Sequence, residues 1–169
     1  YAYYKKFPDR KKKQFKDILF INGCGLPHPA RYRVDHQVEQ LRAAGMSADV
    51  VYYDSLTMDR LKYYRGFVFF RCPVTDTVRE FIVAAKESNK TCFFDIDDLV
   101  IDKKYTDKIK YVQNMSVSDK SLYDDGVNRM RETLELCEYA ITTTERLQEE
   151  LQRYIAGAVH INRNVASDE

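Results

Sequence analysis

Three carboxylates within four residues mark the part of this chain that is best suited to chemistry. Asp95, Asp97 and Asp98 follow directly on the short apolar run 92–94. Such a run is typical of a buried parallel strand, which delivers the residues after it to the carboxyl edge of the sheet. Ligands bind at that edge in open α/β sheets, and carboxylates accept hydrogen bonds from hydroxyl groups. We therefore expect these acids to bind a polar ligand; the alternative is a solvated turn that caps the next segment.

Alternation along an extended segment predicts different roles for the three acids. Successive side chains point to opposite faces, so Asp95 and Asp97 are expected to face a cleft while Ile96 packs inward. Asp98 is then expected to cap the segment 99–103, or to pair with Arg71 or with a basic residue of the weakly patterned segment 102–120. A divalent cation is the other ligand that such a cluster attracts.

A glycine-rich loop is the second candidate site. The segment 23–29, GCGLPHP, joins a predicted strand at 17–22 to a predicted helix, and its Gly and Pro content predicts that it is not itself helical. Gly23 and Gly25 allow the backbone to approach a ligand closely. Because N–H groups at the start of a helix bind phosphate or hydroxyl groups, we predict that this loop contacts substrate.

Three arginines are the candidate partners of an anionic group. Arg31 and Arg33 lie at the start of the predicted helix, where a cation opposes the helix dipole and needs an anionic ligand or solvent. Arg71 follows the predicted strand 66–70 and therefore lies at the same sheet edge as the loop. We predict that these side chains neutralise a phosphorylated ligand.

Strands and helices alternate along the whole chain, which predicts an α/β fold with a Rossmann-like, doubly wound and mostly parallel sheet. The predicted strands are 17–22, 48–53, 66–70, 91–95, 139–142 and 158–161. Gly45 is expected to end the first helix, and Thr143 or Thr144 to begin the last. Residues 102–120 are weakly patterned, which indicates either a mobile lid or a surface helix with a loop.

The composition narrows the class of protein. A chain of 169 residues suits one domain, and a formal net charge of +1 argues against nucleic-acid binding driven by overall charge. No apolar run approaches the roughly 20 residues that cross a bilayer. The 4 cysteines are widely spaced, so we expect buried free thiols in a cytoplasmic protein.

Residues 1–16 differ from the rest because basic and aromatic side chains alternate in them. We expect a leader or linker; the alternative is contact with phosphate or with anionic lipid at the inner face of a membrane. The chain begins with Tyr1 and its first methionine is Met46, so we expect it to be part of a longer protein.

Two enzyme classes share a short motif with this chain. INGCG is similar to the glycine-rich loop of methyltransferases that use S-adenosylmethionine, but Pro27 and Pro29 follow where a helix should start. FDIDDLV is similar to the motif of haloacid-dehalogenase-type phosphatases, with Asp95 as nucleophile, Asp97 as acid and Mg²⁺ between them. In those phosphatases the motif lies near the start of the core, whereas here it follows about 90 residues, and Leu99 replaces a threonine.

A third resemblance uses more of the chain. GCGLPHPARYRV, FFDIDDLV, LELCEYAITTTERLQEEL and VHINRNVASDE occur in this order. The order resembles the N-terminal domain of GT-B glycosyltransferases, in the retaining family-4 group, over residues 16–166. The ITTTERL segment and the strand ending near Asn164 are the most specific parts of the resemblance.

The resemblance implies two Rossmann-like domains that face each other across a cleft. The N-terminal domain, here 17–166, mainly binds the acceptor. The acceptor is a glycan, a lipid-linked molecule or another acceptor in polysaccharide or glycoconjugate synthesis. The C-terminal domain, absent from this chain, holds the nucleotide-sugar donor, so the chain would be inactive alone. Such enzymes need no metal and no cofactor.

At the residue level, the resemblance gives no catalytic assignment. Many members carry a His near the end of the fourth strand, where this chain has Asp95. The predicted substrate-binding residues are therefore those named above: Gly23, Gly25, Arg31, Arg33, Arg71, Asp95, Asp97 and Asp98. The alternative class is a non-catalytic Rossmann-like binding domain.

Overall fold

The fold is described by a computed structural model that covers residues 15–164; most of the predicted leader, residues 1–14, lies outside the described residues. The strands are β1 (Lys16–Asn22), β2 (Ala48–Tyr52), β3 (Tyr64–Phe70), β4 (Thr91–Asp95), β5 (Tyr139–Thr142) and β6 (Val159–Ile161). The helices are α2 (Pro27–Ala30), the π-helical η2 (Arg31–Asp35), α3 (His36–Ala43), the 3₁₀ turns η3 (Tyr53–Ser55) and η4 (Met58–Lys62), α4 (Asp76–Glu87), α5 (Lys103–Thr106), α6 (Lys110–Gln113), α7 (Val117–Leu136) and α8 (Glu145–Leu151).

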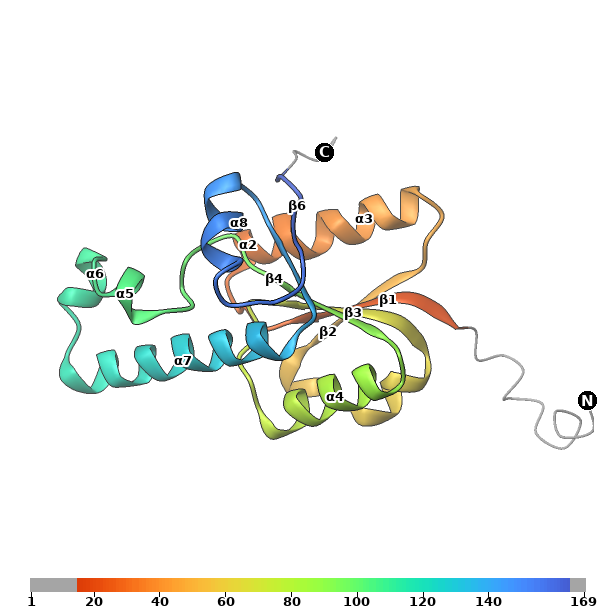
Figure 1. The fold of residues 1–169 in the computed structure, drawn as a ribbon, viewed down its shortest axis with the longest axis horizontal. Helices are drawn as coiled ribbons and strands as arrows, with labels where there is room; N and C mark the ends of the chain where they lie inside the picture. Colours follow the sequence, from red (N-terminus) through yellow and green to blue (C-terminus); the bar gives the residue numbers. More distant parts are fainter. Residues whose placement is uncertain (1–14, 165–169) are drawn as a thin grey trace, which may run out of the picture.

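All strands belong to one six-stranded sheet with the order β2-β1-β3-β4-β5-β6, and each neighbouring pair is parallel. Helices cover both faces (Figure 1). The prediction of a Rossmann-like, doubly wound α/β fold is confirmed. The chain moves from β1 to β2 in one direction and then returns past β1 to β3, so the topological switch lies between β1 and β3. Ligands bind beside such a switch in doubly wound sheets.

The ends of the central strands are level with one another. Asn22 lies beside Phe70 in register, and Phe70 lies beside Asp95. The loops after β1, β3 and β4 therefore leave the sheet at one edge. This brings together the glycine-rich loop, Arg71 and the acidic cluster, as the sequence analysis predicted.

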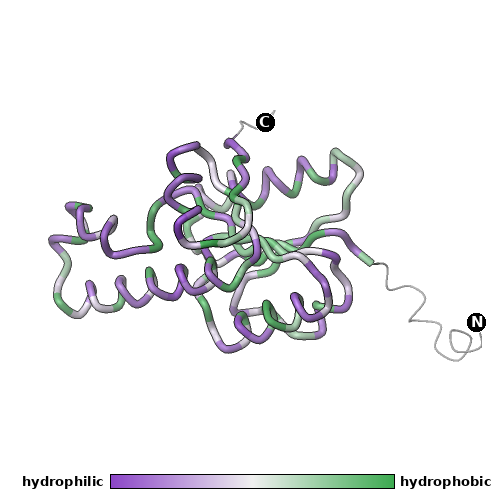
Figure 2. Tube along the Cα trace, viewed as in Figure 1, coloured by the Kyte–Doolittle hydropathy of each residue, from purple (hydrophilic) through white to green (hydrophobic). Residues whose placement is uncertain are grey.

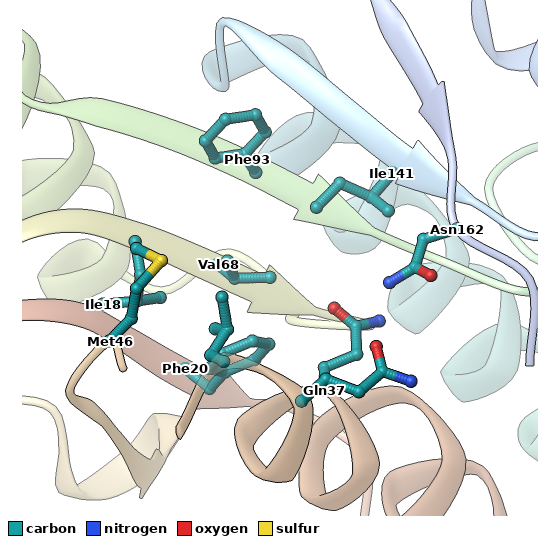
Figure 3. Close-up of a pocket in the computed structure, with 10 residues that line it drawn as sticks. Ile18, Phe20, Gln37, Met46, Val68, Phe93, Ile141 and Asn162 are labelled. Carbon is teal, nitrogen blue, oxygen red and sulfur yellow. The ribbon is translucent and has the colours of Figure 1, made fainter. Parts of the chain in front are cut away.

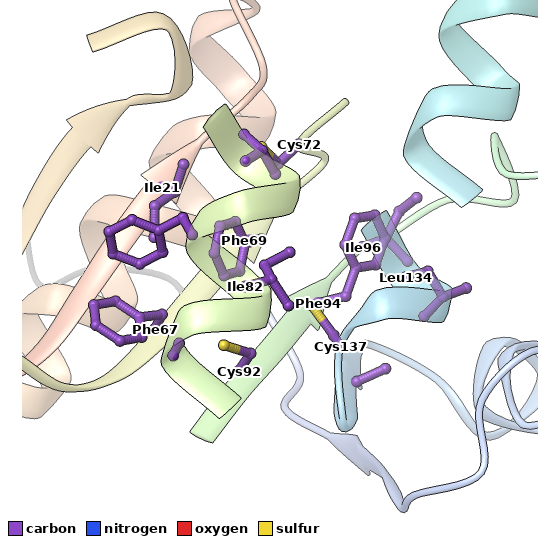
Figure 4. Packing of buried hydrophobic residues seen from close by; sticks show 14 of the residues in the cluster. Ile21, Phe67, Phe69, Cys72, Ile82, Cys92, Phe94, Ile96, Leu134 and Cys137 are labelled. Carbon is purple, nitrogen blue, oxygen red and sulfur yellow. The ribbon is translucent and has the colours of Figure 1, made fainter. Parts of the chain in front are cut away.

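The larger core lies on the face covered by α4 and α7 (Figure 1). Ile21, Phe69 and Phe94 stand beside one another in register, and Ile82 of α4 and Leu134 of α7 pack over them (Figure 4). Burial of each such side chain contributes about 1.5–3 kcal/mol. The strands are accordingly the most hydrophobic part of the trace in Figure 2.

The opposite face is covered by one continuous helical run, residues 27–43, made of α2, η2 and α3. Val34 and Val38 of this run pack with Phe20 and Val68 of the sheet. Gly45, with φ of 80°, follows the run and ends it as predicted.

The prediction that residues 23–29 are not helical is wrong for its second half. Helix α2 begins at Pro27, and Pro29 also lies in its first turn. Proline is compatible with these positions, because the first N–H groups of a helix have no partner within the helix and a fixed φ suits it. Arg31 and Arg33 therefore lie one turn or more inside the helical run.

Residues 103–113 form two short helices, α5 and α6, which project with the start of α7 beyond the sheet (Figure 1). Ser116 caps α7, because its side chain accepts a hydrogen bond from the N–H of Asp119. Thr144 caps α8 in the same way, as predicted. Within residues 15–164, no helix is long and apolar enough to cross a membrane.

Candidate functional site

The candidate site is a pocket of about 470 Å³ at the carboxyl edge of the sheet. The loop after β1, the residues after β3 and β4, and one side of α7 form its walls. Four of the predicted site residues line this pocket: Gly23, Gly25, Arg71 and Asp98. The pocket thus lies beside the switch between β1 and β3.

The backbone at the base of the pocket is unusually tight. The N–H of Gly23 donates to the carbonyl of Phe70 at 2.8 Å, and a Cβ on Gly23 would lie 2.4 Å from Cα of Cys72. Only glycine fits this approach of two loops. Next to it, Arg71 has φ of 40°, in the left-handed region, while its N–H donates to the carbonyl of Asp95 at 3.0 Å. Backbone strain of this kind concentrates at functional sites.

Two of the three acids, Asp97 and Asp98, accept hydrogen bonds from neighbouring groups of the protein. Arg71 donates from Nε to Oδ1 of Asp97 at 2.7 Å, and this ion pair is half-buried. Asp98 is exposed, and its Oδ1 accepts the N–H of Leu99 at 2.7 Å. Asp98 thus bonds only to the residue that follows it, whereas the helix that comes next, α5, is capped by Asp102; it is Asp97 that pairs with Arg71. Ile96 is fully buried, as predicted.

The third acid, Asp95, is the centre of a buried network. Its oxygens accept from Nε and Nη2 of Arg33 at 2.9 and 2.8 Å, and from Nε2 of Gln37 at 3.0 Å. Nη1 of Arg33 donates to the carbonyl of Asn162 at 2.6 Å and to Oδ1 of Asn164 at 3.2 Å. This arrangement ties the helical run to β4 and to the chain after β6.

The expectation that Asp95 faces a cleft is wrong, and Arg33 meets a carboxylate of the protein instead of solvent, because both residues have an exposed fraction of 0%. Arg33 is inside the helical run on its sheet-facing side, so the anion that it needs comes from the protein. Burial raises the pKa of Asp95, while the charge of Arg33 and the hydrogen bonds from Arg33 and Gln37 oppose that shift. Because Asp95 has no access to solvent, this geometry also argues against a phosphatase that uses it as nucleophile.

Arg31 behaves differently from Arg33. It is exposed and does not line the pocket. Its predicted contact with an anionic ligand remains a prediction.

The α7 wall of the pocket was not identified by the sequence analysis. Leu122, Gly126 and Met130 lie at i, i+4 and i+8, so they share one side of the helix, and Tyr123 lies beside them. The helical spacing of these residues is visible in the sequence, but no neighbouring residue indicates that they face the glycine-rich loop. Burial, with the nearby carboxylate of Asp98, raises the pKa of Tyr123, so its hydroxyl retains its proton at neutral pH and can donate a hydrogen bond.

The cysteines are free, and Cys72, Cys92 and Cys137 are buried as predicted. Burial raises the pKa of the Cys92 thiol to about 12, and it raises the pKa of the other two as well. These thiols are therefore protonated and unreactive. Cys24 is half-buried, which differs from the prediction because it lies in the pocket wall.

A second pocket, of about 310 Å³, lies between α3 and the sheet face that α3 only partly covers. Ile18, Phe93 and Ile141 supply its apolar floor, while Gln37 and Asn162 lie at one end (Figure 3). It offers few polar groups to orient a ligand.

Within the part of the chain that the structure describes, no group of three or more His, Cys, Asp or Glu side chains is arranged to hold a metal ion. The candidate site is lined by hydrogen-bonding groups and apolar side chains. No known protein family and no curated protein matches this chain.

Proposed function

We propose that this chain is the acceptor-side domain of a GT-B glycosyltransferase, and that a nucleotide-sugar donor binds mainly to a second domain outside it. The observation that carries this proposal is the pocket beside the switch between β1 and β3, where doubly wound sheets bind their ligands. The order of the sequence motifs supports it, because the GCGL loop and the FDIDDL segment both contribute to this pocket. Three buried free thiols support a cytoplasmic location.

The polar groups of the pocket suit a sugar acceptor. Asp98 can accept a hydrogen bond from a hydroxyl through the oxygen that is not bonded to the N–H of Leu99, and Tyr123 can donate one. Within the described residues, the N–H groups of Gly25 and Leu26 form no hydrogen bond and are available to a ligand oxygen. In this proposal the domain orients the acceptor hydroxyl toward the donor, which contributes to catalysis by positioning.

The experiment that tests the proposal is a titration of isotope-labelled chain 1–169 with methyl glycosides of glucose, galactose and mannose, followed by NMR. We expect amide shifts at Gly25, Asp98 and Tyr123 for at least one sugar. Asp98→Asn should weaken that binding by about 1.5–3 kcal/mol, because it removes a charged acceptor. Asp35→Asn, an exposed change away from the pocket, serves as the matched control.

Shifts confined to residues outside the pocket, or an Asp98→Asn variant that binds as the parent does, would contradict the proposal. In that case a non-catalytic binding domain would become the better explanation of the fold.

A further inference from the structure

Gly126 lies in the middle of α7, and its backbone gives no reason for a glycine. Its φ is not in the left-handed region, and no atom lies within 4 Å of the position that a Cβ would take. Glycine destabilises a helix interior relative to alanine. What Gly126 provides is space, because it lines the pocket and leaves a notch in its α7 wall.

Apolar side chains surround this notch. Leu122 and Met130 lie one helical turn before and after Gly126 on the same side of α7. Leu26, from the loop after β1, lines the same pocket. Leu122 has an exposed fraction of 74% and Leu26 of 61%, although both are side chains that normally leave water. The notch therefore has the shape and the chemistry to hold an apolar group.

The charges of the same pocket favour a neutral ligand. Arg71 and Asp98 contribute one positive and one negative charge, and Arg71 is already paired with Asp97. Apart from Arg71, no lysine or arginine lines the pocket among the described residues, so a phosphate would find no unpaired cation there. Hydroxyl groups match the polar side chains better.

We propose that the acceptor is a neutral glycoside whose sugar is attached to an apolar group, and that this group packs over Gly126 between Leu26 and Leu122. This inference rests on the proposed function and narrows the class of its acceptor. Asp98 and Tyr123 then bind the sugar hydroxyls.

The test measures the affinity of chain 1–169 for methyl, butyl, hexyl and octyl glycosides of the same three sugars, each below its critical micelle concentration. Each methylene that leaves water should strengthen binding by roughly fourfold until the notch is full. We expect the octyl glycoside to bind at least about tenfold more tightly than the methyl glycoside.

Two variants test whether the gain in affinity with alkyl chain length comes from the notch. Gly126→Leu should fill the notch and remove the dependence on chain length, while its melting temperature stays equal or rises. Leu122→Gln should reduce the gain without blocking the pocket. Val117→Gln is the matched control, because Val117 lies on the same helix with an exposed fraction of 90% but does not line this pocket.

The outcomes separate this inference from the proposed function. Equal affinity for methyl and octyl glycosides, or unchanged octyl binding by Gly126→Leu, would overturn the inference and leave the proposed function standing. Octanol that binds as tightly as the octyl glycoside would show that no sugar is recognised, and would overturn both. Failure of every glycoside to bind would also overturn both.

Discussion

Arg31 and Arg33 lie two residues apart in one helical run, yet their surroundings differ completely. Arg33 is fully buried against Asp95, whereas Arg31 is exposed. Removal of one member of a buried ion pair leaves an unpaired charge in the interior, which is far more costly than loss of a surface charge. The stability of the two variants should therefore differ sharply.

We predict that Arg33→Met lowers the free energy of unfolding by about 3–5 kcal/mol, since it leaves the Asp95 carboxylate without its partner. Arg31→Met should change that free energy by less than about 0.5 kcal/mol. Urea denaturation of both variants measures the difference. The double variant Arg33→Met with Asp95→Leu should recover part of the loss; no recovery would mean that the pair acts through something other than its charge.

Two glycines of the candidate site give a second comparison. A methyl group on Gly23 would collide with backbone atoms, at 2.4 Å from Cα of Cys72, whereas a methyl group on Gly126 meets nothing. Gly23→Ala should therefore cost about 1–3 kcal/mol by overpacking, and Gly126→Ala should gain about 0.5–1 kcal/mol of helix stability. Chemical denaturation measures the free energy of unfolding of both variants. Equal effects of the two changes would contradict the close approach described for Gly23.

Among the helices, α5 is held against α7 and the turn after α8 by polar contacts that surround Asp102. This carboxylate caps α5 through the N–H of Lys104 at 2.9 Å and accepts from the hydroxyl of Tyr154 at 2.8 Å. Arg131 of α7 lies 3.4 Å from it. Burial alone would raise the pKa of Asp102, but these hydrogen bonds and charges outweigh burial, and its pKa is lowered.

Because the pKa of Asp102 is lowered in the folded state, the stability that this residue contributes depends on pH. A carboxyl group whose pKa is lower in the folded state stabilises the protein above its unfolded pKa, and this contribution disappears as the pH falls through the folded pKa. We predict that Asp102→Asn lowers the free energy of unfolding by about 1 kcal/mol at pH 7 and flattens its decline below about pH 4. Urea titrations between pH 3 and 7 test this, with the exposed change Asp35→Asn as the control; parallel pH profiles for the parent and Asp102→Asn would refute it.

In the molecule as a whole, the pocket lies at one edge of the sheet, and the proposed function assigns the nucleotide-sugar donor to a second domain. We therefore predict that chain 1–169 folds but transfers no sugar from nucleotide-sugars, as judged by release of the free nucleotide. Transfer by a longer chain with the second domain should be insensitive to EDTA. Turnover by residues 1–169 alone, or activity that EDTA abolishes and Mg²⁺ restores, would contradict the proposed division of labour.

The six strands and their order could be predicted from the sequence alone. The bounds of β4 and β5 match the predicted 91–95 and 139–142, and Gly45 and Thr144 end and begin helices as expected. These features depend on short-range physics: the alternation of apolar side chains, the steric freedom of glycine, and a hydroxyl that accepts a nearby N–H. The parallel, doubly wound arrangement follows from their order.

Which side chains line the pocket and which contact each other depends on the packed fold and could not be predicted locally. Arg33 and Asp95 are 62 positions apart, and no local pattern indicates that they neutralise each other in the interior. Leu122 and Gly126 of α7 likewise line the pocket only because the fold places this helix beside the loop after β1. A buried charge or apolar side chain contacts whichever partner the fold brings within a few ångströms. That partner can lie anywhere in the sequence, so local patterns do not predict it.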